Sequence, residues 1–391
     1  MKLKKFLSMA VASALAFSLV ACGGEAGNES ANTGSDRIIL GTMGPLTGEN
    51  AIYGITTLNG ISLAIEEKET VLGKPVELLS VDDKADQTEA VKAYNKFVNN
   101  DKVVAIVGAT TSGASLSVAV TSVKDNTPIL TPTGTVPEIT TSGENVFRAC
   151  YTDPKQGEIM AKFAYESLGL RKVAIIENTD SSYSAGLTAS FTRRFVELGG
   201  EIISNEGYTG ADKDFKAQLT KIASTNPEAL FIPDYYTQAY LIASQAESAG
   251  LKDVVLLGGD GWDGMHTIFK EYENGEINES SILENAYFCS HYSMDDTEPQ
   301  VQSFVEAYRA KYGEDPTAFA ALGYDGANIM MNAIETAGST DSQAIIDAIK
   351  NTQYKGVTGD ITFDENGDPI KEVTILKIEG GKYKLFEKIA E

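Results

Sequence analysis

Residues 103–115 read Val-Val-Ala-Ile-Val-Gly-Ala-Thr-Thr-Ser-Gly-Ala-Ser. The five apolar residues have the length of a buried strand, and the glycine and small hydroxyl residues behind them are typical of a turn that opens a helix. A helix that begins with Ser and Thr offers backbone N–H groups and hydroxyl donors, which suit an anion such as a carboxylate. Simple N-capping explains the same residues without a ligand. The loop lacks the lysine of a phosphate-binding P-loop.

Short apolar runs alternate with amphipathic segments along most of the chain. The apolar spacing in residues 90–98 and again in 301–308 gives one face of a helix. Asp86 followed by Glu89 is a capping signal for the first of these helices. Such alternation predicts mostly parallel sheets with helices on both faces, and the number of elements favours two α/β lobes. Further buried-strand candidates are Val173 to Ile176, Leu230 to Ile232 and Val254 to Leu257.

The C-terminal end has a different pattern. Three short runs with strand character follow one another with only turns between them, which predicts hairpins rather than β-α units. The acidic segment Asp364-Glu-Asn-Gly-Asp368 lacks the spacing and the terminal Glu of a calcium loop, so we interpret it as a hairpin turn. The three runs are Ile361 to Phe363, Val373 to Lys377 and Tyr383 to Phe386.

Composition excludes several classes of function. The chain has 391 residues and a net charge of −23, with 32 Lys and Arg against 55 Asp and Glu. This balance, without a basic stripe, argues against nucleic acid as a partner. Three Cys cannot build a disulfide scaffold, and two His leave little room for metal or triad chemistry. We find no nucleophile–base pair, carboxylate dyad or metal cluster, and we therefore expect neither an enzyme nor a bound cofactor or metal.

The N-terminus reads as a secretory signal. Basic residues precede an apolar run, Phe6 to Val20, that is too short to span a bilayer as a helix. The run ends in Leu19-Val20-Ala21-Cys22, which resembles a bacterial lipobox, so residues 1–21 are the predicted signal peptide and Cys22 the lipidated N-terminus. A plain signal peptide with an incidental Cys is the alternative. Residues 22–36 are rich in Gly, Asn, Ser and Glu, which predicts a flexible tether.

A set of motifs runs in order through residues 37–391. Together they are highly specific, although none is decisive alone. They resemble the leucine/isoleucine/valine-binding proteins of bacterial ABC importers. The matching segments are Gly41-Thr-Met-Gly-Pro-Leu-Thr-Gly48 with Tyr53-Gly54, Gly108-Ala-Thr-Thr-Ser112, Thr131-Pro-Thr-Gly-Thr135, Phe147-Arg148, Asp153-Pro154 with Gln156-Gly157, Asp212-Lys-Asp-Phe215, Ala249-Gly250-Leu251 and Gly258-Gly-Asp-Gly261.

The resemblance implies a type I periplasmic-binding fold. This is an α/β architecture of two doubly wound parallel-sheet lobes, joined by three crossing strands, that closes on a ligand in the cleft. Residues 37–149 with 289–356 are the expected N-terminal lobe. Residues 150–288 with 357–391 are the expected C-terminal lobe.

The resemblance also implies a set of ligand-binding residues. Ser112 and Thr135 match the residues that hold the ligand carboxylate. The carbonyl of Thr133, with Thr135 and Asp260, falls where the family binds the α-ammonium group. Thr110 and Thr111, beside Ser112, are more polar than is usual for leucine binders of this family, which leaves a smaller or hydroxylated amino acid open as the ligand. The residues aligned with the side-chain pocket are Tyr53, Tyr183, Tyr235 and Phe319.

Two cysteines fall on aligned crossing strands. Cys150 lies in the segment 147–151 and Cys289 in 287–292, and these strands lie near each other in the family's fold. Because an extracytoplasmic setting permits disulfides, two alternatives stay open: a disulfide or close thiol pair, or two buried free thiols.

The expected function is that of a solute-binding lipoprotein, anchored to the cell membrane at Cys22 and working outside the cytoplasm. It would be a monomer that delivers a neutral amino acid, of the branched-chain type, to an ABC permease and its ATPase subunits. The alternative is a sensory lipoprotein that binds an amino acid or amide and signals through a membrane partner. The family's fold also serves amides, urea-like solutes and aromatic acids, so the ligand class depends on Ser112 and Asp260 together.

Overall fold

The computed structural model describes residues 36–272 and 283–389. The predicted signal peptide, the lipidation site Cys22 and almost all of the tether lie outside these residues. The described residues form one compact unit. No helix in the described part of the chain combines the length and the hydropathy needed to cross a membrane.

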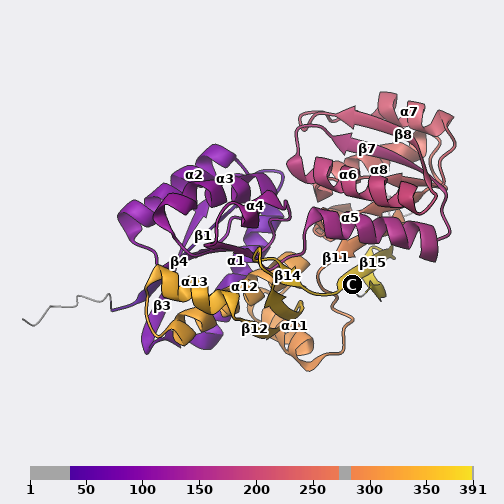
Figure 1. The fold of residues 1–391 in the computed structure, drawn as a ribbon. Coiled ribbons are helices and arrows are strands. Elements are labelled where there is room, and N and C mark those ends of the chain that lie inside the picture. Colours follow the sequence, from indigo (N-terminus) through magenta and orange to yellow (C-terminus); the bar gives the residue numbers. More distant parts are fainter. Residues whose placement is uncertain (1–35, 273–282, 390–391) are drawn as a thin grey trace, which may run out of the picture. The chain divides into compact units, whose positions relative to one another are not determined.

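The first sheet contains six strands within the described residues (Figure 1). Neighbouring strands are parallel, except that β2 pairs with β3 in the antiparallel direction. The apolar run at residues 103–107 forms its central strand. In sheet order the strands are β2 (Thr70–Val71), β3 (Lys74–Asp82), β1 (Ile38–Gly44), β4 (Ala105–Val107), β5 (Ile129–Thr131) and β6 (Val146–Arg148).

The second sheet has seven strands in the same described ranges. Its parallel part contains the other three buried-strand candidates, and its antiparallel edge is the predicted C-terminal hairpin of β15 and β16. In sheet order the strands are β16 (Lys382–Ile389), β15 (Val373–Glu379), β11 (Ala286–Ser290), β10 (Val255–Gly258), β9 (Ala229–Phe231), β7 (Lys172–Asn178) and β8 (Glu201–Tyr208).

Most helices follow the strands as the alternation predicts. The capping signal is confirmed, because the Asp86 side chain accepts the backbone N–H groups of Thr88 and Glu89 at 2.8 and 2.9 Å. The helices are α1 (Ala51–Lys68), α2 (Gln87–Lys96), α3 (Ser112–Ser122), α4 (Glu138–Thr141), α5 (Asp153–Lys162), α6 (Ser182–Glu197), α7 (Lys216–Ser224), α8 (Tyr236–Ser248), α9 (Met265–Tyr272), α11 (Pro299–Tyr312), α12 (Ala318–Ala337) and α13 (Ser342–Lys350).

Both sheets bury side chains on both faces. In β4, Val107 packs with α1 and α12, while Ile106 packs with α2 and α3 on the opposite face. In β7, Ile176 packs with α7 and α8, while Ile175 packs with α5 and α6. Strand residues that alternate between two buried faces explain why these runs are apolar throughout. The predicted α/β class with two parallel-sheet lobes is therefore confirmed.

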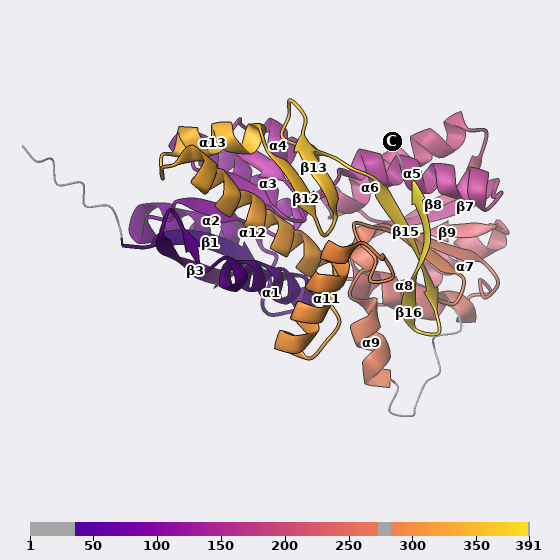
Figure 2. The ribbon, with the colours of Figure 1, turned by 90° about the horizontal axis from the view of Figure 1, so that it is seen from below.

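A small third sheet lies beside α12 (Figure 2). It consists of β12 (Gln353–Gly356), β13 (Gly359–Phe363) and β14 (Pro369–Ile370). Ile361 of β13 is buried in the same core as Leu40 of β1 and Val107 of β4. By its packing, this segment goes with the first lobe. The lobe boundaries drawn from the sequence stay a prediction.

The chain passes between the two lobes three times within the described ranges. The first crossing joins β6 to α5, the second joins β11 to α11, and the third joins β14 to β15 (Figure 1). Each lobe is thus assembled from segments that are distant in sequence. The residues on these crossings lie between the two lobes, close to the site described next.

Candidate functional site

The first half of the site is the N-terminus of α3, which follows β4. Thr111 is the N-cap and Ser112 is the first helical residue. The Ser112 hydroxyl lies 3.1 Å from the Thr135 hydroxyl and accepts the Thr135 backbone N–H at 3.2 Å. Thr133, in the same loop as Thr135, donates its hydroxyl to the Thr110 carbonyl at 2.6 Å. Thr111 Oγ1 is buried and has no hydrogen-bond partner among the described residues. Backbone N–H groups and hydroxyls at a helix N-terminus favour an anion at this position.

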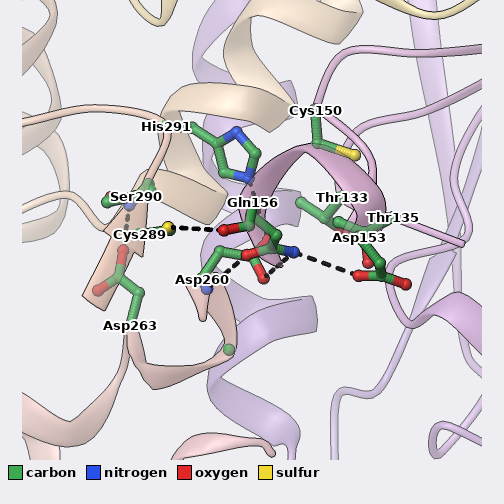
Figure 3. Close-up of polar contacts among 12 residues, drawn as sticks. Thr133, Thr135, Cys150, Asp153, Gln156, Asp260, Asp263, Cys289, Ser290 and His291 are labelled. Atoms are coloured by element: carbon green, nitrogen blue, oxygen red, sulfur yellow. Dashed lines mark hydrogen bonds and ion pairs between the residues drawn. The ribbon is translucent and has the colours of Figure 1, made fainter. Parts of the chain in front are cut away.

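The second half of the site is the carboxylate of Asp260, in the loop after β10. Its side chain is buried and accepts hydrogen bonds from other segments of the described chain (Figure 3). Tyr183 Oη and Gln156 Nε2 donate to Oδ1 at 2.8 and 3.2 Å. His291 Nε2 lies 3.0 Å from Oδ2. The Gln156 amide also closes a ring, because its Oε1 accepts the Asp260 backbone N–H at 3.1 Å.

Aromatic rings form the walls between these two poles. Tyr53 stacks on Phe319 with ring centroids 4.3 Å apart, and Tyr183 stacks on Tyr235 at 5.1 Å. Tyr53 meets Tyr235 edge to face at 5.4 Å. The Tyr53 hydroxyl also donates to the Gly261 carbonyl and accepts the Tyr236 backbone N–H at 2.9 Å. Rings arranged in this way present an apolar surface to whatever lies between them.

All of the ligand-binding residues predicted from the sequence line one cavity, together with Thr110 and Gly261. The lining side chains meet closely across it and leave little free space between them. This arrangement of side chains therefore holds about one water molecule. A ligand of amino-acid size needs a wider arrangement of these side chains than the one in this structure. The cavity residues are Tyr53, Thr110, Thr111, Ser112, Thr133, Thr135, Tyr183, Tyr235, Asp260, Gly261 and Phe319.

Sequence reasoning missed three buried polar residues behind Asp260. Gln156 and Asp153 belong to a matching motif but have no role in the expected site, and His291 is one of the two histidines for which the sequence indicates no metal or triad chemistry. Gln156 Nε2 donates to Asp153 Oδ1 at 3.2 Å as well as to Asp260. Burial, above all, raises the pKa of Asp153 well above its usual range and lowers that of His291 to about 4. His291 is therefore neutral at physiological pH.

The two cysteines are buried free thiols, so the disulfide alternative is not what the structure contains. Cys150 Sγ donates to the Gly134 carbonyl at 3.2 Å, and Cys289 Sγ donates to the Gln156 carbonyl at 3.5 Å. Each thiol is directed at a carbonyl of a different segment. Burial raises the pKa of Cys150 to about 12, which keeps it protonated and unreactive.

Asp263 connects the Asp260 loop to the first lobe. Its Oδ2 accepts the backbone N–H of Ala318, the first residue of α12, at 2.5 Å. Phe319, a wall of the cavity, is the next residue. A carboxylate at a helix N-terminus is a favourable cap, but burial raises the pKa of Asp263 from 3.8 to about 7, and Asp260 adds to the effect.

We expect Asp263→Asn to stabilise the protein at pH 8 and to leave its stability at pH 4 unchanged. In the wild type, the unfolded chain ionises near pH 4 and the folded chain only near pH 7, so Asp263 lowers stability progressively across that range. Asn keeps an acceptor for Ala318 and removes the charge. The gain has an upper bound of about 4 kcal/mol. Urea unfolding of both proteins at pH 4, 6 and 8 measures it, and a difference that does not vary with pH would contradict the assignment.

A two-lobed α/β fold with a polar and aromatic cavity between its lobes defines the class of protein, one that closes around a small solute. The chain belongs to the periplasmic binding protein family, whose model matches residues 37–382. This family consists of solute-binding proteins that act outside the cytoplasm, and not of enzymes. The resemblance found in the sequence is thereby confirmed.

Named relatives cover nearly the whole chain. The Leu/Ile/Val-binding protein BraC3 of Rhizobium johnstonii is 30% identical over 354 residues, which are 88% of this chain and 92% of the relative. The crystal structure of the leucine binding protein LivK from Thermotoga maritima is 36% identical with a TM-score of 0.85, covering 90% and 99% of the two chains. LivJ from Streptococcus pneumoniae, crystallised with isoleucine, is 30% identical with a TM-score of 0.83 and the same coverage.

Proposed function

We propose that the protein is the solute receptor of an ABC importer and binds a neutral amino acid of the branched-chain type in the cavity between its lobes. The observation that carries this proposal is the opposition of two poles. The N-terminus of α3, with Ser112 and Thr135, favours a carboxylate, and Asp260 favours an ammonium group. Aromatic rings separate the two poles.

A zwitterion loses water from both charged ends when it enters a closed cavity, so each end needs fixed partners. The α3 N–H groups and the hydroxyls of Ser112 and Thr135 serve the carboxylate. Asp260 with the carbonyl of Thr133 serves the ammonium group through charge-assisted hydrogen bonds. The walls of Tyr53, Tyr235 and their neighbours then bury an aliphatic side chain, which contributes about 25 cal/mol per Å² of apolar surface.

The names of the relatives support this ligand class. BraC3 is described as binding leucine, isoleucine and valine, LivK as binding leucine, and LivJ was crystallised with isoleucine. The protein would release its ligand to a permease with ATPase subunits. We further propose that it is monomeric and is held at the membrane by a lipid on Cys22, which follows from the lipobox-like sequence at residues 19–22.

A thermal-shift panel of the twenty amino acids tests the ligand class. A ligand that binds only the folded protein raises its melting temperature, and the rise grows with concentration relative to the dissociation constant. We expect leucine, isoleucine or valine to give the largest rise. A panel in which no amino acid shifts the melting temperature, even at millimolar concentration, contradicts the proposal.

We expect Ser112→Ala to weaken binding of that amino acid by about 1–3 kcal/mol, because the hydroxyl is lost while the backbone donors of α3 remain. Isothermal titration calorimetry measures the change. Ser117→Ala on the same helix is the matched control, since its hydroxyl donates to the Gly113 carbonyl and does not line the cavity. Equal affinities for the two variants would place the carboxylate away from Ser112.

A further inference from the structure

We propose that Gln156 and His291 are positioning residues, which leave the Asp260 carboxylate a single open acceptor position and thereby set the direction from which the ligand ammonium group binds. The proposal rests on the function proposed above and goes beyond it, because neither residue lines the cavity. Gln156 follows the first crossing between the lobes, and His291 begins the second. Figure 3 shows both side chains directed at Asp260.

The orientation of the Gln156 amide is fixed by its partners. The Asp260 backbone N–H can only donate, so the atom 3.1 Å from it is Oε1 and the atom that faces the carboxylates is Nε2. Nε2 lies 3.2 Å from Asp260 Oδ1 and 3.2 Å from Asp153 Oδ1. Both of its hydrogens are thus used, one for each carboxylate. Gln156 is fully buried at the start of α5, immediately after the first crossing.

The His291 ring is fixed in the same way. It lies directly after β11, on the second crossing, and its side chain is fully buried. The neutral ring carries one proton, and the neighbouring Asp260 Oδ2 at 3.0 Å is an acceptor, so the proton is on Nε2. Nδ1 has no hydrogen-bond partner in the described part of the chain. The ring packs against Tyr151 of the first crossing, with centroids 3.8 Å apart and the two planes tilted by 32°, which restricts its rotation.

Counting acceptor positions leads to the inference. A carboxylate offers about four lone-pair positions, two on each oxygen. Tyr183 and Gln156 occupy both positions on Oδ1, and His291 occupies one on Oδ2. Among the described residues, no other side chain donates to Oδ2, so one position is left for the ligand. Removing Gln156 or His291 frees the carboxylate to turn, and the ammonium group then loses its oriented partner.

The test compares L-leucine with 4-methylpentanoate, which is leucine without its amino group. Gln156→Met keeps the length of the side chain and removes the amide, and His291→Phe keeps the packing against Tyr151 and removes the donor. We expect each variant to bind leucine about 10- to 100-fold more weakly and to bind 4-methylpentanoate within about threefold of the wild type. Calorimetry, with competition experiments for the weaker ligand, gives both constants. His291→Gln, which restores an N–H donor, should recover part of the leucine affinity.

The control is Ser290→Ala, which removes a buried hydroxyl that donates to the Tyr292 carbonyl, on the same crossing and away from Asp260. It should leave both constants unchanged. If Gln156→Met and His291→Phe weaken both ligands equally, the two residues only support the fold and the inference is wrong. The inference is also wrong if neither variant changes the affinity for leucine. A wild type that binds leucine no better than 4-methylpentanoate instead overturns the proposed function, and this inference with it.

Discussion

Asp260→Asn loses affinity for a neutral amino acid by roughly 2–5 kcal/mol, about 30-fold to several thousandfold, while the protein keeps its fold. The substitution preserves the shape of the side chain and removes the charge that faces the ligand ammonium group. The desolvated ammonium group of the ligand then faces a neutral amide in place of a carboxylate. The hydrogen bonds of the residue 260 side chain with Tyr183, Gln156 and His291 must also rearrange. Calorimetric titration with the amino acid that gives the largest thermal shift measures the loss.

The matched control for this variant is Asp325→Asn. Asp325 is also a fully buried carboxylate, but it accepts hydrogen bonds from Val357 and Thr358 in the first lobe and does not line the cavity. Its substitution should lower the melting temperature without a comparable loss of affinity. Near-normal binding by Asp260→Asn would place the ammonium group elsewhere. Equal losses of affinity in both variants would show that the substitutions act by disturbing the fold.

Much of the architecture follows from local sequence. The apolar runs that form β4, β7, β9 and β10 are each followed by a helix, because strands buried on both faces and amphipathic helices carry distinct periodicities. The cap at Asp86 is likewise a signal contained within a few residues. The packing of Ile361 is different. The sequence pattern predicts its strand, but no neighbouring residue indicates in which core its side chain is buried.

The residues around the cavity show the same limit of prediction from local sequence. Ser112 and Asp260 lie in loops after strands, where a parallel sheet places its ligands, and the family resemblance brought the distant aromatic residues to them. Gln156 and His291 meet Asp260 across 104 and 31 residues of chain. Neither a glutamine in a helix nor a histidine beside a strand belongs to a sequence pattern that predicts contact with a distant aspartate. The packing of α5, β10 and β11 in one core of the second lobe brings them together.

The two cysteines show why proximity in a fold family does not determine chemistry. Cys150 lies on the first crossing and Cys289 in β11, just before the second, yet Cys150 is directed at the Gly134 carbonyl and Cys289 at the Gln156 carbonyl. Disulfide formation depends on the directions of the two Cβ–Sγ bonds, which sequence spacing does not contain.

Substitution of Arg148 is the second change from which we expect a large effect, in this case on the stability of the fold. It lies on β6, with its side chain fully buried beneath the loop that holds Thr133 and Thr135. Its guanidinium group donates to the Gly134 carbonyl at 2.8 Å, to the Pro137 carbonyl at 3.2 Å and to the Thr140 hydroxyl at 2.9 Å. It also pairs with Asp368 at 2.5 Å, in the turn after β13. One side chain therefore joins the binding loop, α4 and the turn of the third sheet.

We expect Arg148→Met to lower the free energy of unfolding by about 3–5 kcal/mol, because two backbone carbonyls, one hydroxyl and the partly exposed Asp368 carboxylate lose a buried donor. Urea unfolding measures the loss. Arg309→Met is the control, because Arg309 pairs with Asp315 at 2.6 Å with both side chains about half exposed, and such a pair contributes at most about 1 kcal/mol. Equal losses in the two variants would mean that Arg148 is not the link between these segments. A larger loss for Arg148→Met, with weakened amino-acid binding in whatever fraction stays folded, is the outcome that this network of hydrogen bonds requires.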